Sequence, residues 1–302
     1  MADSGRAIEL IGAPSSAGAF SRGQEEAPAA LRRAGIVRLM RAADLDVIDT
    51  GDLPLRRWRP DRASPRAQNA AEVVANAAGV RDRVTVACGN ARRVLVLGGD
   101  CTTGLGTLAG VCAVAERPPS WLYFDLHADL NTTTSVPDGA LDWTGMAHAL
   151  ALADTVPALR QIGGTPLASP DRVLLFGHDL AEATEYEREQ IERLGLGSIP
   201  CSEVAADPSG AAQSALRRLE AEAPIVVHLD VDVINFTDAP LSEHTGRGTG
   251  IPLATALHAL QVLMADQRVC ALTVAELNPQ HAAADPDCLA RFTAGLVGAL
   301  AA

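Results

Sequence analysis

Short runs of apolar, largely β-branched residues alternate along this chain with longer stretches rich in alanine, leucine and arginine. Several short runs are continuously apolar, a pattern typical of strands that are covered on both faces. The runs predict strands at Ile8–Ile11, Asp46–Asp49, Val94–Leu97, Trp121–Phe124, Val173–Phe176, Ser198–Ile199, Ile225–Leu229 and Leu272–Ala275. The longer stretches predict helices at Ala27–Ala42, Arg66–Cys88, Thr103–Ala115, Ala181–Leu194, Ser209–Glu222, Leu253–Met264 and Asp285–Leu300.

The regular alternation of strand and helix indicates right-handed crossovers between parallel strands. We therefore expect an α/β fold, a three-layer sandwich around a mainly parallel sheet of about eight strands. The sequence shows no internal repeat and no linker, so it predicts one domain spanning residues 1–302. Arg56–Pro65 is rich in arginine and proline, which favours a surface loop. The polar stretch Asn131–Thr144 is long enough to form the rim of a site.

Composition narrows the possible partners. Apolar residues make up 48% of the 302 residues, which is enough for a large core, and the net charge of -12 argues against nucleic acid. No apolar run reaches the roughly 18 residues that a membrane helix needs, so we expect no membrane partner. Met1–Arg6 lacks the apolar segment of a signal peptide, and the six cysteines show no CxxC spacing. These features predict a reduced, cytoplasmic protein.

Polar and acidic residues follow four of the predicted strands. Gly98–Cys101 reads Gly-Gly-Asp-Cys, and Asp125–Asp129 reads Asp-Leu-His-Ala-Asp. Asp230–Asp232 reads Asp-Val-Asp, and Glu276–Pro279 follows the last strand. Ligands of open parallel sheets bind outside the carboxyl ends of the strands, so these segments are expected to share one site.

The chemistry of these segments favours metal ions. Four carboxylates, Asp125, Asp129, Asp230 and Asp232, would repel one another at close range, and divalent cations would remove that repulsion. In an extended chain Asp125, His127 and Asp129 would point to the same side, and the second pair would repeat that arrangement. A single Asp-x-Asp pair is more often a turn or a helix cap, and a lone histidine is more often a core residue. Two such segments at two strand ends favour a metal site.

These segments resemble the ureohydrolase superfamily, which includes arginase, agmatinase and formiminoglutamase, and the likeness spans nearly the whole chain. Besides the acidic segments, Ile11–Pro14, Gln24–Gly35 and Gly51–Pro54 resemble the amino-terminal part of arginase. The resemblance implies a small guanidino substrate and two Mn²⁺ ions as cofactors. It also favours a homo-oligomer, either a trimer or a hexamer.

By the same resemblance, Asp125 and Asp230 would bridge the two metal ions. Asp129 would complete the shell of one ion, while His127 and Asp232 would complete that of the other. A hydroxide held between the metals would be the nucleophile, because metal binding lowers the pKa of water. Asp129 would accept a hydrogen bond from this hydroxide and pass its proton to the leaving amine.

The resemblance also assigns residues to the substrate. Glu276 would pair with the guanidinium nitrogens and hold the electrophile over the nucleophile. Asn131 would help to hold the amino-acid end of the substrate. Asp179 and Glu182 lie in a segment that resembles its counterpart only loosely. They are candidates to receive an α-ammonium group, or they simply cap a helix.

The chain departs from the superfamily pattern at two places. The motif Gly-Gly-Asp-His ends here in Cys101, which either takes the place of a first-metal histidine or is a buried thiol in a decayed site. The loop motif Ser-Gly-Asn-x-His-Gly-Met-Pro becomes Asp138–Ala147, which has no clear equivalent of the histidine thought to shuttle protons. His148 lies nearby, but a histidine on a helical face is more often structural.

A cysteine at the first-metal position is also the pattern of the arginase-like Nω-hydroxy-L-arginine hydrolases of D-cycloserine biosynthesis. Those enzymes likewise lack the loop histidine and carry an Ala-Glu-Leu-Asn segment, as here at Ala275–Asn278. The resemblance therefore predicts hydrolysis of Nω-hydroxy-L-arginine to L-ornithine and hydroxyurea. One alternative is a hydrolase of L-arginine or of a decarboxylated or acylated analogue. Another is a metal-poor pseudoenzyme that acts as a binding or scaffold subunit.

Overall fold

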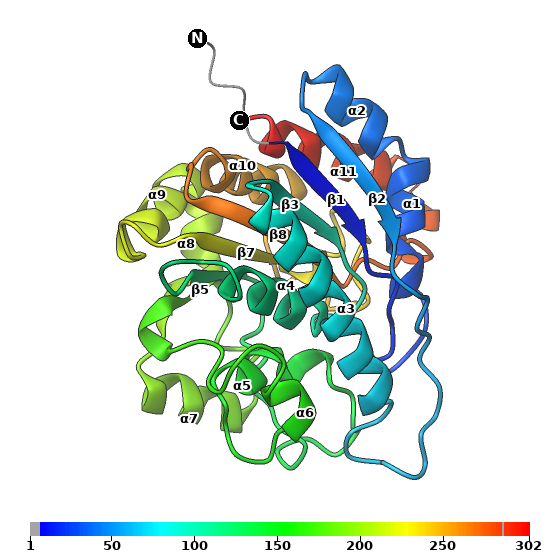
Figure 1. Cartoon of the computed structure of the whole chain (residues 1–302), viewed down its shortest axis with the longest axis vertical. Helices are drawn as coiled ribbons and strands as arrows, with labels where there is room; N and C mark the ends of the chain where they lie inside the picture. The colour runs from blue at the N-terminus through cyan, green and yellow to red at the C-terminus, as the bar shows by residue number, and fades with distance from the viewer. Residues whose placement is uncertain (1–6, 286) are drawn as a thin grey trace.

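The strands form one sheet in which every neighbouring pair is parallel (Figure 1). The structure, a computed structural model, describes residues 7–285 and 287–302, so the signal-peptide prediction for Met1–Arg6 lies outside it. The strands are β1 (Ile8–Gly12), β2 (Val47–Asp52), β3 (Arg93–Leu97), β4 (Ser120–Phe124), β5 (Val173–His178), β6 (Gly197–Pro200), β7 (Ile225–Asp230) and β8 (Val269–Ala275). Their order across the sheet is β2-β1-β3-β8-β7-β4-β5-β6. This arrangement confirms the expected α/β fold.

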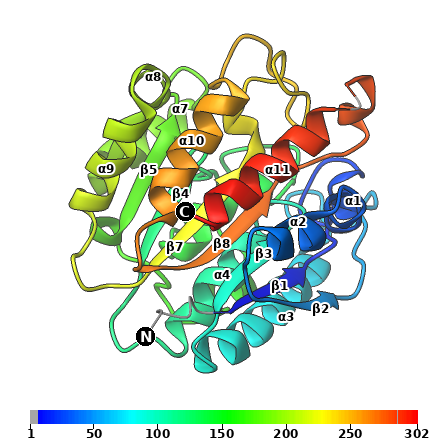
Figure 2. The same cartoon turned by 90° about the horizontal axis from the view of Figure 1, so that it is seen from above.

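Helices cover both faces of the sheet, because side chains on alternating strand positions bury themselves on opposite sides. Leu95 and Leu97 of β3 join one apolar core, whereas Val94 and Val96 join the other. Figure 2 shows α10 and α11 over one face and α3 and α4 over the other. The continuously apolar runs in the sequence reflect this double coverage.

Each predicted helical range overlaps an observed helix in the same order, but α5, α6 and α8 were not predicted. The bounds of the helices are α1 (Ala27–Arg33), α2 (Ile36–Ala42), α3 (Ala70–Gly89), α4 (Thr103–Cys112), α5 (Gly145–Ala149), α6 (Pro157–Arg160), α7 (Glu185–Leu194), α8 (Cys201–Ala206), α9 (Pro208–Arg218), α10 (Leu253–Met264) and α11 (Cys288–Leu300). Short 3₁₀ helices lie at η1 (Gln24–Glu26), η2 (Asp142–Thr144), η3 (Pro170–Arg172), η4 (Val231–Val233) and η5 (His281–Ala284).

Local backbone chemistry explains where the predicted bounds were wrong. The single helix expected at residues 27–42 is broken, because Gly35 adopts a left-handed conformation with φ of 92° between α1 and α2. The helix expected from Ala181 begins instead at Glu185. Thr184 caps it, accepting a hydrogen bond from the backbone N–H of Glu187, whose side chain binds the N–H of Thr184 in return. The short helices α5, α6 and α8 have too few turns to show a clear apolar period.

The order of the strands brings together the four strand ends that carry the polar segments. Strands β3, β8, β7 and β4 lie next to one another at the middle of the sheet, and all of them run in one direction. Each is followed by one of the polar segments singled out in the sequence. Within the described ranges, no helix combines the length and apolarity that a membrane span requires.

Candidate metal centre

The loop after β3 is held in place by its glycines and by a buried aspartate. A Cβ atom on Gly99 would lie 1.6 Å from the carbonyl oxygen of Ser15, so only glycine allows the two backbones to approach. Asp100 is fully buried and accepts hydrogen bonds from the Ser15 hydroxyl at 3.0 Å and from the backbone N–H of Gly18 at 3.1 Å. These contacts fix the position of Cys101, the next residue, at the edge of the sheet.

The segment after β4 does not continue as an extended chain, so the expected alternation of its side chains was wrong. Strand β4 ends at Phe124, and Asp125 Oδ1 accepts a hydrogen bond of 2.6 Å from the backbone N–H of His127. Such an aspartate turn reverses the backbone. Asp129 then adopts a left-handed conformation with φ of 51°. Turns, not strand geometry, bring Asp125, His127 and Asp129 toward the same space.

The segment after β7 also forms an aspartate turn. Asp230 ends the strand, and its Oδ1 accepts a hydrogen bond of 2.7 Å from the backbone N–H of Asp232. The chain then enters the 3₁₀ helix η4. Asp232 Oδ2 lies 2.8 Å from His127 Nδ1, which joins the two turns.

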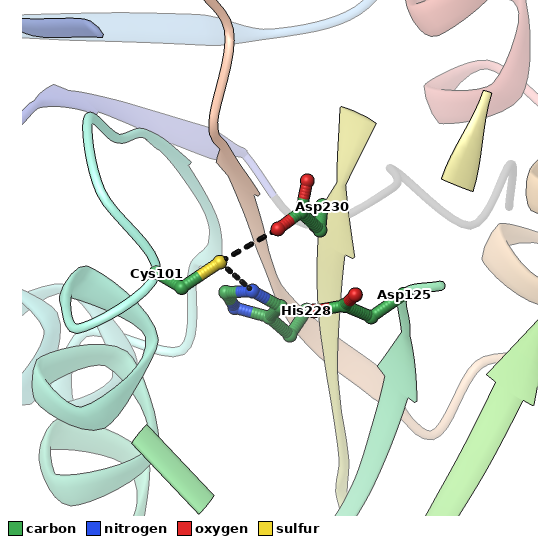
Figure 3. A group of neighbouring side chains, drawn as sticks. All are labelled: Cys101, Asp125, His228 and Asp230. Carbon is green, nitrogen blue, oxygen red and sulfur yellow. Dashed lines mark hydrogen bonds between the residues drawn. The ribbon is translucent and has the colours of Figure 1, made fainter. Parts of the chain in front are cut away.

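Among the described residues, three groups of ligand atoms converge here: one consists of His127, Glu182 and His244, and Asp125 belongs to both of the others. The first group contains Cys101, Asp125, His228 and Asp230 (Figure 3), and the second contains Asp125, His127 and Asp232. Within each group one ligand atom per residue lies within 4.8 Å of the others. Oδ2 of Asp125 and Oδ1 of Asp232 are buried without a hydrogen-bond partner among the described residues. The donors and their unpaired oxygens fit divalent cations at two adjacent positions.

The electrostatics of these side chains also favour bound cations. Burial, together with the neighbouring carboxylates, raises the pKa of Asp125 to about 7 and raises the pKa values of Asp129 and Asp230 well above their usual range. Burial and the same carboxylates raise the pKa of the Cys101 thiol. Burial would lower the pKa of His127, but Asp232 and Asp125 raise it overall. Positive charge at this place would allow the acidic groups to ionise together.

Asp129 lies at the same edge but has a different partner. Its Oδ2 accepts a hydrogen bond of 2.5 Å from the hydroxyl of Tyr123, and its carboxylate lines the cavity over the site. Asp129 is outside the two donor groups described above. The buried hydroxyl of Tyr123 therefore positions this carboxylate, which faces the cavity.

Glu276 follows β8 and faces the same cavity. Its Oε1 accepts a hydrogen bond of 3.0 Å from the backbone N–H of Cys101, and its Oε2 accepts one from the side-chain amide of Gln24. Glu276 adopts a left-handed conformation with φ of 63°, and its own backbone N–H donates to the carbonyl oxygen of Gly99 at 2.7 Å. Both oxygens of this carboxylate are thus held in a fixed orientation.

A cavity of about 250 Å³ opens above these residues, close to the lower end of the ~300–1,000 Å³ typical of small-molecule sites. The predicted rim loop contributes Asp138, Ala140, Asp142 and Trp143. Of the predicted substrate residues other than Glu276, Glu182 lines the cavity.

The other two predicted substrate residues lie outside the cavity lining. The side chain of Asn131 is buried, and its Oδ1 accepts hydrogen bonds from Ser135 and Thr184, at 3.0 Å each. Asp179 Oδ1 accepts a hydrogen bond of 2.9 Å from the backbone N–H of Ala181. Asn131 therefore supports the loop behind the cavity, and Asp179 forms a turn before α7, whose cap is Thr184 and not Asp179.

Sequence reasoning missed two histidines. His228 precedes Asp230 by two residues, and its Nε2 lies 3.2 Å from Cys101 Sγ. Alternation along β7 puts both residues on one face and was the available signal. His244 lies in a loop and lines the cavity, with its ring centroid 5.2 Å from that of His127. Nothing in the local sequence marks His244. His148 is a structural residue, as expected: it is buried and bonded to Thr144 and Val156.

Known proteins are similar to this chain in both sequence and fold. The family model described as Arginase family matches residues 6–301. The arginase of Bacillus caldovelox is 30% identical over 288 residues, covering 90% of this chain and 91% of that protein. The arginase of Brevibacillus brevis is 29% identical over 283 residues, covering 90% of each. The solved structure of the Bacillus caldovelox arginase has a TM-score of 0.86 at 26% identity and covers 98% of both chains.

These likenesses confirm the resemblance to the ureohydrolase superfamily that the strand-end motifs indicated. Proteins of the matching family use a dinuclear metal site, and the two donor groups at the sheet edge provide candidate ligands for one. Because the match extends over nearly the whole length, this chain belongs to the arginase family and is a metal-dependent ureohydrolase.

Proposed function

We propose that this enzyme hydrolyses Nω-hydroxy-L-arginine to L-ornithine and hydroxyurea. The observation that carries the proposal is the place of Cys101, whose Sγ lies 2.9 Å from Asp230 Oδ2 within the first donor group. The sulfur therefore lies among the candidate ligand atoms and does not point away into the core, which supports a role for it as a ligand. A decayed site would not need the other carboxylates to remain gathered around it.

Two divalent ions, when bound, would lower the pKa of a water molecule and so supply a nucleophile near neutral pH. A thiolate at position 101 adds a negative charge that a neutral imidazole lacks, which weakens the ion beside it as a Lewis acid. Such a site suits a substrate that needs less activation than arginine. An N-hydroxyguanidine is less basic than a guanidine, so more of it is neutral near pH 7.

The residues over the metal ligands have complementary roles in this proposal. Glu276 would bind the guanidine nitrogens through its fixed carboxylate and orient the carbon that is attacked. Asp129, oriented by Tyr123, would accept the proton of the attacking water and deliver it to the leaving amine. Hydrolysis adds the water oxygen to the guanidine carbon, and the bond from that carbon to the ornithine nitrogen breaks.

The outer part of the cavity would hold the amino-acid end. Glu182, Thr184 and Glu187 line it, and the lining contains neither arginine nor lysine. Two carboxylates on that side favour the α-ammonium group of an amino acid. Glu182 keeps the role given to it by the sequence, whereas we assign no direct contact to Asn131 or Asp179.

A second candidate function is hydrolysis of an unmodified guanidino compound. The observation that favours it is that the curated relatives are named arginases. Under either reaction we propose two Mn²⁺ ions, with the first site less selective for Mn²⁺ because a soft sulfur ligand accepts Zn²⁺ or Fe²⁺ more readily. We also propose a homo-oligomer, a trimer or hexamer, acting in the cytoplasm.

A panel of substrates tests the function directly. The purified enzyme with added Mn²⁺ would be assayed with Nω-hydroxy-L-arginine, L-arginine, agmatine and N-acetyl-L-arginine, measuring ornithine and the released hydroxyurea or urea. The expected result is a kcat/KM for hydroxyarginine at least about tenfold above that for arginine, equivalent to ~1.4 kcal/mol. An Asp230→Asn variant controls for metal dependence. Equal or higher kcat/KM for arginine would exclude the proposed specificity and favour the second candidate.

A further inference from the structure

His228 lies within β7, two residues before the acidic end of the strand at Asp230. It pairs in register with Tyr123 of β4, so the two rings stand side by side on neighbouring strands. Their planes are inclined by only 3°, and their centroids are 4.3 Å apart. Both residues are fully buried, and each precedes by two positions one of the aspartates, Asp125 or Asp230. The stacking fixes the plane of the imidazole beside the other members of the first donor group.

The imidazole of His228 points at the sulfur that replaces the usual histidine. His228 Nε2 lies 3.2 Å from Cys101 Sγ, and the same sulfur lies 2.9 Å from Asp230 Oδ2 (Figure 3). For a tetrahedral ion with bonds of about 2.3 Å to sulfur and about 2.0 Å to nitrogen, the two ligand atoms lie ~3.5 Å apart. The observed separation is close to that value, so one ion can be bound by both.

A glycine in helix α4 leaves room for this ring. Gly104 lies in the first turn of α4, and a Cβ atom there would approach His228 Nδ1 to 2.5 Å. Glycine within a helix is less favourable than alanine by about 1 kcal/mol. Gly104 on α4 therefore provides the space for the imidazole, while β7 carries the ring.

We propose that His228, which lies on β7, is a ligand of the first metal ion. It would supply the imidazole that position 101 lacks. The inference rests on the proposed dinuclear site and adds a residue to it. The first ion would then have one thiolate, one imidazole and two carboxylates, from Cys101, His228, Asp125 and Asp230. This mixed sulfur and nitrogen set lets Zn²⁺, Co²⁺ or Fe²⁺ compete with Mn²⁺ for the first of the two proposed positions. The second group, with no sulfur, keeps its preference for harder ions.

The competing role for His228 is a hydrogen bond to the Cys101 sulfur without contact to the metal. The two roles differ in magnitude and in spectrum. Loss of a residue that only supports a ligand weakens metal binding by about 10–100-fold. Loss of a ligand removes an atom from the shell of the ion, which X-ray absorption detects directly.

The experiment uses the metal alone and needs no substrate. The full-length protein, freed of metal, would be titrated with Co²⁺, and the thiolate-to-cobalt absorption band would report occupancy of the site that contains Cys101. In His228→Gln, we expect this affinity to fall by more than about 100-fold. His178→Gln is the matched control, because His178 is another buried histidine, at the end of β5, outside both groups. We expect its affinity to remain within about threefold of the unmodified protein.

Two further measurements keep the inference testable if His228→Gln folds poorly. Gly104→Ala keeps the imidazole but crowds it, and we expect the same cobalt band to weaken. In the unmodified protein with one equivalent of Zn²⁺, X-ray absorption should show one sulfur and one imidazole at each sulfur-bound zinc. A sulfur-bound zinc without imidazole, or an affinity loss below about tenfold in His228→Gln, would overturn the proposal. Lack of hydroxyarginine turnover would instead refute the proposed function and leave this ligand assignment standing.

Discussion

The backbone N–H of Cys101 donates a hydrogen bond of 3.0 Å to Oε1 of Glu276, and so joins the loop after β3 to the end of β8. The bond involves the main chain of Cys101 and leaves its sulfur free to face Asp230. One residue therefore supports the substrate carboxylate with its backbone and offers a metal ligand with its side chain. Substitutions at position 101 can change the metal shell while this support for Glu276 remains.

Returning the imidazole to position 101 should shift the substrate preference. Because His228 Nε2 lies 3.2 Å from the Cys101 sulfur, the single variant Cys101→His would be crowded. The double variant Cys101→His, His228→Ser relieves that contact and removes the thiolate charge. We expect higher Mn²⁺ occupancy of the first site, together with a rise of about tenfold in kcat/KM for arginine relative to hydroxyarginine. Metal analysis and parallel kinetics with both substrates measure these changes.

His228→Ser alone is the control for the double variant. If the double variant gains Mn²⁺ but keeps the original ratio of the two kcat/KM values, the ligand at position 101 does not set specificity. The rim loop Asp138–Ala147, which lines the cavity through Asp138, Asp142 and Trp143, would then be the next segment to exchange.

Removing the charge of Glu276 should affect turnover far more than metal binding. In Glu276→Gln, the charge-assisted pairing with the guanidine is lost while the shape of the side chain remains. We expect kcat/KM to fall by about 10–100-fold, in line with ~1.5–3 kcal/mol for hydrogen bonds to charged groups. Metal content after dialysis should stay unchanged. Glu243→Gln is a suitable control, since this buried carboxylate binds Ser21 and Asn278 outside the cavity lining.

His148 should make the folded state sensitive to acid. Burial, with a smaller effect of the Arg160 charge, lowers its pKa to about 4, although the bond from the ring to the carbonyl oxygen of Thr144 acts in the opposite direction. The neutral ring also accepts a hydrogen bond from the N–H of Val156. The unfolded value is about 6.5, so the unfolded chain binds the additional proton between these two pH values. The contribution of His148 is thus complete above about pH 6.5 and is lost as pH falls toward about 4.

From these values, His148 should account for about 2 kcal/mol of the loss in unfolding free energy between about pH 7 and pH 5. Urea unfolding at several pH values measures the total loss, to which carboxylates also contribute. His148→Gln can still accept from Val156 but cannot gain a proton, so its stability should fall less steeply over this range. Parallel curves for the two proteins would show that His148 is not the sensitive group.

His244 is the candidate for the proton-transfer role of the missing loop histidine. It lines the cavity, and its ring lies edge-on to that of His127 with centroids 5.2 Å apart. We expect His244→Gln to lower kcat by about 100-fold or more, as for loss of a general acid or base, with metal content unchanged. His258→Gln provides a control, because His258 bonds to the hydroxyl of Ser209 away from the cavity. If the two variants have equal kcat, His244 has no part in proton transfer.

The sequence predicted the sheet well because strands buried on both faces appear in it as continuous apolar runs. Runs such as Val94–Leu97 and Trp121–Phe124 are apolar or aromatic at every position, and they lie within β3 and β4. The break between α1 and α2 was harder to predict, since it depends on the left-handed conformation of Gly35. A glycine within a helical pattern often continues the helix, so its conformation follows from packing that a pattern does not contain.

At the site, the sequence identified which segments meet but not how they meet. Asp125, His127 and Asp129 do converge, yet they do so through an aspartate turn and a left-handed residue, not through strand alternation. His228 was overlooked because a histidine in an apolar run resembles a core residue until the opposite partner is known. That partner, Cys101, is 127 positions away in the chain, and only the three-dimensional fold brings the two together.

The central place of β7 has a consequence for how the molecule fluctuates. Opening of a sheet usually begins at its edges, here β2 and β6, whereas β7 lies between β8 and β4. Backbone amides of β2 and β6 should therefore exchange their hydrogens through small local openings. Those of β7 should exchange only when the whole chain unfolds. The strand that presents Asp230 would thus remain folded through every partial opening, and metal would be retained until cooperative unfolding releases it.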